Sequence, residues 1–140
     1  MRNFRPPVFR DRPIAALATG PGLVWFDFKD ICEGPRSQND YIEVAQLYHT
    51  VFVSNIPLFT AVNENSARRF IMLIDEFYDR CVNIVVSAAA QPAELYQGQK
   101  LQFEFQRAAS RLMEMQTQQY LAGQHRQQGA SAPGIIRAQK

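Results

Sequence analysis

An apolar run followed by two acidic residues is the first place where this sequence could carry chemistry. The run FIMLIDE, residues 70–76, ends in Asp75 and Glu76. In a phosphate-transferring enzyme, a buried strand can end in such a pair, with one carboxylate holding magnesium and the other activating water. The periodicity argues otherwise, because apolar and charged residues of 68–81 fall on opposite arcs at 100° per residue. Glu76 and Arg80 also have the acid-before-base spacing of four that stabilises helices. The stretch is therefore predicted to be a helix, with both carboxylates on its solvated face.

The other half of a nucleotide site, a phosphate-binding loop, has no match in the sequence. Such a loop needs the pattern GxxxxGK[ST], whose glycines let backbone N–H groups approach the phosphates while the lysine reaches them. The nearest candidate, Gly98-Gln99-Lys100-Leu101, fails the pattern. We therefore expect no nucleotide cradle within this chain.

Charge is unevenly distributed along the 140 residues. Residues 1–13 carry four arginines against one aspartate, and residues 123–140 carry three basic residues and no acid. The intervening 14–122 carry eight basic and twelve acidic residues. A nucleic-acid reader usually concentrates positive charge on a folded face, so no nucleic-acid partner is expected.

Metal and membrane chemistry are not favoured either. Cys32 and Cys81 lack CxxC spacing, and His49 and His125 form no ligand cluster with them. The thiols are expected to be free in a reducing compartment. No apolar run approaches the roughly 20 residues of a membrane span, so no integral membrane segment is expected.

The remaining patterns predict alternating strands and helices. Strands are expected at 12–17, 23–28, 50–54, 82–88 and 101–105, and helices at about 37–49, 68–81 and 106–121. Either Ser37 or Asn39 can cap the first helix. The fold class is α/β: a mixed, largely parallel sheet whose doubly apolar central strands indicate helices on both faces. Residues 1–11 are expected to be an irregular basic N-terminus, 12–122 the folded region, and 123–140 a disordered tail.

Three long motifs carry a family resemblance. They are GPRSQNDYIEVAQLYHTVFVSNIP, SARRFIMLIDEFYDRCVNIVVSAAAQPAELYQG and FEFQRAASRLMEMQTQQYL, within residues 34–121. Together they resemble the C-terminal part of the ZapE-type cell-division ATPases, in the AFG-like branch of the AAA+ P-loop superfamily. The resemblance covers roughly residues 10–122.

The resemblance implies a function for a longer protein. Full-length members bind ATP and Mg²⁺ through Walker A and Walker B motifs that precede the matched region. Bacterial members are cytoplasmic and linked to the FtsZ ring, whereas mitochondrial ones are linked to protein quality control; homo-oligomers are possible. The chain is thus expected to be a C-terminal fragment that binds no cofactor and hydrolyses no ATP alone. The alternative is a freestanding interaction module that docks onto division proteins or full-length ATPase.

Arginines are the best candidate site residues. Arg107 and Arg111 lie on one stripe of the final helix, and late arginines in AAA+ proteins often contact nucleotide phosphates. Both are therefore candidate phosphate contacts, while the structural alternative pairs Arg111 with Glu114 or with the acidic face of 75–79. Arg68 and Arg69 begin the long helix, where positive charge opposes the helix dipole, and are interface candidates.

Overall fold

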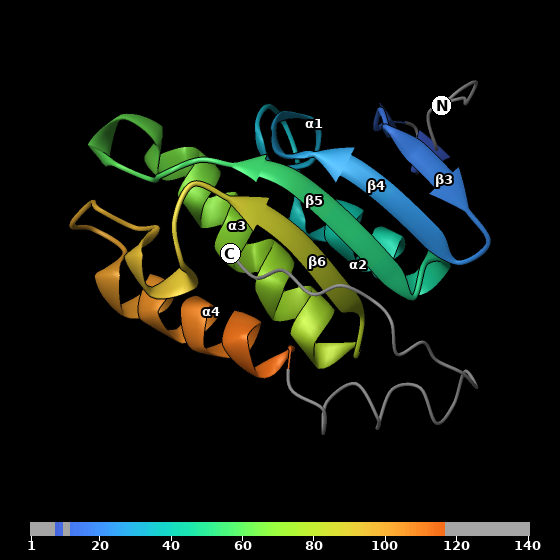
Figure 1. Cartoon of the computed structure of the whole chain (residues 1–140). Helices are drawn as coiled ribbons and strands as arrows, with labels where there is room; N and C mark the ends of the chain where they lie inside the picture. The colour runs from blue at the N-terminus through green and yellow to red at the C-terminus, as the bar shows by residue number, and fades with distance from the viewer. Residues whose placement is uncertain (1–7, 10–11, 117–140) are drawn as a thin grey trace.

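The computed structural model describes residues 8–9 and 12–116 (Figure 1). The strands are β1 (Val8–Phe9), β2 (Arg12–Pro13), β3 (Ala18–Gly20), β4 (Leu23–Asp27), β5 (Thr50–Ile56) and β6 (Asn83–Ala88). The α-helices are α1 (Phe28–Cys32), α2 (Gln38–Leu47), α3 (Glu64–Asp79) and α4 (Gln102–Glu114). Two 3₁₀ turns, η1 (Ala61–Asn63) and η2 (Pro92–Glu94), lie in the connections.

The main sheet has the strand order β3-β4-β5-β6. β3 pairs with β4 as an antiparallel hairpin, while β4–β5 and β5–β6 are parallel pairs joined through helices. The register places Trp25, Phe52 and Val85 side by side across the three parallel strands. The predicted class, a mixed and largely parallel sheet flanked by helices, is confirmed.

The helices lie on one face of this sheet. In Figure 1, α2 and α3 lie behind the strands, and α4 packs beside α3. Strand side chains that point toward the helices are buried: Val24, Phe26, Val51, Val53 and Ile84. The expectation of helices on both faces is not met, because no helix of 12–116 covers the opposite face. The strand residues on that opposite face are partly apolar, which is why the sequence pattern predicted helices on both faces.

An aromatic cluster joins the helices to the end of the sheet. Phe70 of α3 lies 5.6 Å from Phe59, 5.9 Å from Phe105 and 6.2 Å from Phe28, between ring centroids. Tyr96 stacks on the far side of Phe105 at 5.3 Å. Offset and tilted rings at these distances pack favourably. The cluster therefore fixes α1, α3 and α4 around one point.

The predictions for the first two long helices are confirmed in type, although α3 begins four residues before the predicted 68–81 and ends at Asp79. α3 buries Phe70, Leu73 and Phe77 on the arc expected from the 100° wheel. α2 begins after Ser37, whose backbone N–H donates to the Asp40 carboxylate at 2.9 Å. Ser37 and Asp40 thus form a capping box, which satisfies backbone N–H groups that have no partner within the first turn of the helix.

The predicted strand at 101–105 is wrong, because Gln102–Phe105 form the first turn of α4 and Leu101 is its N-cap residue. Leu101 and Phe105 are buried, whereas Phe103 between them is 78% exposed. The spacing of four between the two buried residues suits a helix. The prediction failed because the exposed Phe103 gave the segment an apolar residue at every second position, as in a strand.

Smaller differences occur near the N-terminal end. The strand expected over 12–17 is limited to β2 at Arg12–Pro13, which pairs with β1 inside the segment expected to be irregular. The five-residue helix α1 was not predicted. The tail at 123–140 lies outside the described residues.

Candidate functional site

Polar side chains meet at the carboxyl ends of the three parallel strands. Asn55 of β5 donates from Nδ2 to Oδ1 of Asp27 on β4 at 2.7 Å, and its backbone N–H donates to Oγ of Ser87 on β6 at 3.0 Å. Trp25 donates from Nε1 to Oγ of Ser54 at 3.1 Å. The carboxyl edge of an open α/β sheet is the usual location of ligand sites. We call Asp27, Ser54, Asn55 and Ser87 the carboxyl-edge cluster.

The backbone at Asn55 is unusual in a strand. Its φ of 65° is left-handed, and the β5–β6 register shifts between Val53 and Ile56. Asparagine tolerates this region better than most residues, and bulges next to functional sites re-aim side chains. Here the bulge turns the Asn55 amide toward Asp27, whose other oxygen, Oδ2, accepts the Lys29 N–H at the start of α1. The carboxyl-edge cluster thus offers hydroxyl and amide groups around one anchored carboxylate.

The sequence analysis missed this cluster. Its members lie on three strands separated by helices, so no short motif contains them. A usable signal was present, since Asp27, Ser54-Asn55 and Ser87 each end an apolar strand. Parallel neighbours bring such ends to one edge.

Arg111 is held between α3 and α4. Its Nη1 donates to Oδ1 of Asp75 at 2.6 Å, and its guanidinium carbon lies 4.8 Å from the centre of the Tyr78 ring. Tyr78 in turn donates from its hydroxyl to Glu114 at 2.9 Å, which raises the pKa of Tyr78. This is the structural pairing with the acidic 75–79 face that the sequence left open. A role of Arg111 toward nucleotide phosphate stays a prediction.

The other candidate arginines are spread over different surfaces. Arg107 and Arg68 are exposed and make no ion pair or hydrogen bond within 12–116. Arg69 is partly buried, and its Nη1 donates to the Cys32 carbonyl at 3.3 Å. Arg107 and Arg111 share α4, but the structure does not bring Arg68 and Arg69 to them.

Side-chain donors engage both carboxylates of the acidic pair in the FIMLIDE run. Asp75 accepts from Arg111, and Glu76 accepts from Gln38 and Arg80. These donors occupy Oδ1 of Asp75 and both oxygens of Glu76, the kind of oxygen ligand that magnesium prefers. Elsewhere in the described part of the chain, no group of three or more His, Cys, Asp or Glu side chains is placed to hold a metal. Nor is any described helix long and apolar enough to cross a membrane.

Comparisons with known proteins decide the family. The family model described as AFG1-like ATPase matches residues 8–124. This chain belongs to the AFG1-like ATPase family. Among its relatives, the cell division protein ZapE of Escherichia coli K12 is 46% identical over 114 residues, which cover 81% of the chain. Lactation elevated protein 1 homolog B of Danio rerio is 32% identical over 125 residues, covering 66% of the chain.

Much of each relative lies outside the match. The chain spans 30% of the length of ZapE and 25% of the zebrafish protein. No solved structure matches. The resemblance to ZapE-type proteins is confirmed. The motif PRSQNDY leads into the start of α2, and SARRFIMLIDEFYD lies within α3.

The Arg111–Asp75 pair gives a stability prediction for this family member. Both side chains are 29% exposed, so water screens part of the attraction. We expect Arg111→Ala to lower the free energy of unfolding by about 1 kcal/mol, through the ion pair and the Tyr78 face. A double-mutant cycle with Asp75→Ala, followed by urea denaturation, should give a coupling of about 0.5 kcal/mol that falls with salt.

Arg107→Ala is the matched control, because Arg107 lies one turn earlier on the same helix. Its effect should stay within about 0.5 kcal/mol. Strict additivity of Arg111→Ala and Asp75→Ala would contradict the pairing.

Proposed function

We propose that this chain is the scaffold-forming part of a ZapE-like ATPase that acts in bacterial cell division. The observation that carries the proposal is the 46% identity to ZapE over 81% of the chain. The name of that relative supports the division role, and a division role would place the protein in the bacterial cytoplasm, with FtsZ as a partner.

ATP and Mg²⁺ are bound, in this proposal, by segments outside the chain. Three observations support that assignment. The sequence has no GxxxxGK[ST] pattern, and Asp75 and Glu76 are engaged by cationic and amide donors. The chain also corresponds to only 30% of ZapE, which leaves most of that protein to supply a nucleotide site.

A chimera tests the proposal. Residues 8–124 replace the matched segment of E. coli ZapE, and ATP turnover is compared for the chimera, ZapE and the isolated chain. We expect turnover within about tenfold of ZapE for the chimera, a loss of at most ~1.4 kcal/mol in transition-state stabilisation, and none for the isolated chain. The chimera is then expressed in E. coli cells that lack ZapE, and cell length is measured as a test of the division role.

Two results would contradict the proposal. Mg²⁺-dependent turnover by the isolated chain would place the nucleotide site within it. A folded chimera that hydrolyses no ATP would show that the segment does not perform the role of its ZapE counterpart. Co-sedimentation with FtsZ polymers separately tests that partner.

A further inference from the structure

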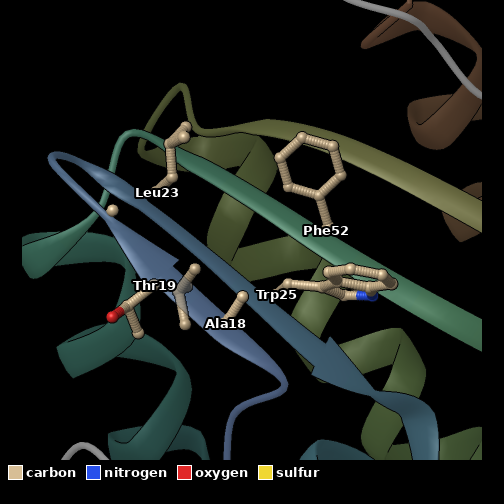
Figure 2. A pocket seen from close by; sticks show the side chains of 7 residues that line it. Ala18, Thr19, Leu23, Trp25 and Phe52 are labelled. Atoms are coloured by element: carbon tan, nitrogen blue, oxygen red, sulfur yellow. The ribbon is translucent and has the colours of Figure 1, made fainter. Parts of the chain in front are cut away.

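The face of the sheet opposite the helices carries an apolar recess. It lies across β3, β4 and β5, encloses about 330 Å³, and is lined mainly by Ala18, Gly20, Leu23, Trp25 and Phe52. Figure 2 shows the Trp25 and Phe52 rings beside one another over the strands, with Leu23 at the start of β4. The recess is therefore a shallow trough with an aromatic wall.

Trp25 is the exposed centre of this surface. It is 42% exposed although it lies on β4, between two paired strands. Parallel sheets are normally covered on both faces, and no helix of the described chain lies here. Its alternate neighbours Val24 and Phe26 are fully buried on the helix face. The sequence thus provides two apolar faces, of which the described elements cover one.

The polar groups around the recess indicate which class of partner could bind it, a lipid surface or a protein. Polar groups lie next to Trp25 at the recess: Ser54 accepts a hydrogen bond from Trp25 Nε1, and Asp27 follows Trp25 two residues later on β4. Thr19 is the polar residue among those that line the recess. An anionic lipid surface would require cationic side chains around the apolar residues. A protein surface with an apolar side chain at its centre fits the recess better.

The size of the apolar patch also limits which protein partner can bind it. A stable interface between separate proteins buries about 800 Å² on each side, whereas a fully exposed aromatic side chain offers about 150–250 Å². Trp25 and Phe52 are already partly buried by their neighbours. The patch is too small to hold two separate copies together. It suffices for a segment linked to the same chain, because a linker supplies an effective concentration in the millimolar range.

We propose that this face docks the nucleotide-binding part of the same ZapE-like ATPase, the part that the relatives carry outside the matched segment. The proposal rests on the proposed function. An apolar side chain of that part fills the recess against Trp25 and Phe52, and a polar group meets the carboxyl-edge cluster at its rim. The docking would complete the second layer of the sheet.

Hydroxyl-radical footprinting with mass spectrometry tests the docking. Trp25 is the single tryptophan of the chain, and its peptide is identified in any protein that contains it. Its oxidation rate is measured in the isolated chain and in the ZapE chimera, with the 78% exposed Phe103 on α4 as the aromatic control. We expect the Trp25 rate to fall about fivefold or more in the chimera, since an interface core is as dry as a protein interior, while Phe103 is unchanged.

The outcomes separate the docking from the function. An active chimera in which Trp25 keeps its isolated-chain rate overturns the docking and leaves the proposed function standing. An inactive but folded chimera in which Trp25 is protected overturns the proposed function and leaves the docking standing. A Trp25 rate that falls with concentration of the isolated chain assigns the face to a second copy and overturns the proposal. If the chimera does not fold, this chain and the remaining part of ZapE are co-expressed as separate chains, and their co-purification is measured. The docking proposal is overturned if the two parts do not co-purify, or if Trp25→Thr does not weaken their co-purification.

Discussion

Phe70→Ala should remove about 3–5 kcal/mol from the free energy of unfolding. Phe70 is 1% exposed and contacts Phe28, Phe59 and Phe105, so its removal leaves a cavity lined by these three rings. Small domains are stable by about 5–15 kcal/mol, which makes this loss a large fraction of the total. Urea denaturation followed by circular dichroism measures it. Phe70→Leu keeps part of the volume and gives a measurable value if the alanine variant does not fold.

Phe103→Ala is the matched control for the same side-chain truncation. Phe103 is 78% exposed on α4, so we expect a change within about 0.5 kcal/mol. The comparison also tests the helical register of 101–105, since a strand would bury Phe103 together with Leu101 and Phe105. Equal losses at Phe70 and Phe103 would contradict the packing described here.

Alkaline pH should unfold the protein through a buried thiol. Burial raises the pKa of Cys32 from 9.0 to about 12, and burial also raises the pKa of Tyr41, whose hydroxyl donates to the Ile31 carbonyl at 2.8 Å. The unfolded chain loses these protons at lower pH than the folded chain, so stability is intact below pH 9 and falls as pH rises toward 12. At about 1.4 kcal/mol per pH unit, Cys32 alone accounts for about 4 kcal/mol.

The control is the second cysteine. Cys81 is exposed and lies just after α3, so Cys81→Ala removes a thiol that is not buried and serves as the matched substitution. Cys32→Ala should flatten the slope between pH 9 and 12, with the part due to Tyr41 remaining. Chemical denaturation at several pH values provides the measurement, and identical slopes for the two variants would exclude the thiol as the cause.

The sequence predicted most of the regular elements because their patterns are long. The apolar arc of α3 and the β-branched run of β5 leave little choice of period. The error at 101–105 came from five residues in which Phe103 is apolar but exposed. Only contact with the aromatic cluster, which depends on Phe59 and Phe70 far away in the sequence, decides that Leu101 and Phe105 face inward.

The candidate site was less predictable than the fold. The sequence offered Glu114 or the acidic 75–79 face as structural partners of Arg111, and the choice of Asp75 depends on how α4 lies against α3. The carboxyl-edge cluster depends on a left-handed Asn55, and no local pattern signals that conformation. Such features arise from tertiary packing, which single-sequence periodicity does not contain.

The strand order β3-β4-β5-β6 has a consequence for how the chain acquires its shape during synthesis. Spatial order equals sequence order, so each strand that leaves the ribosome finds the edge it must join already present. Within this sheet, the first pairing is the local hairpin of β3 and β4, closed between Gly20 and Leu23. β5 and β6 each pair only after a helix has been made. Nascent domains fold from the N-terminal side, and distant pairings are the slow ones. The sheet can therefore be assembled by successive addition at a single growing edge, without an early strand having to wait for a later one to be inserted beside it.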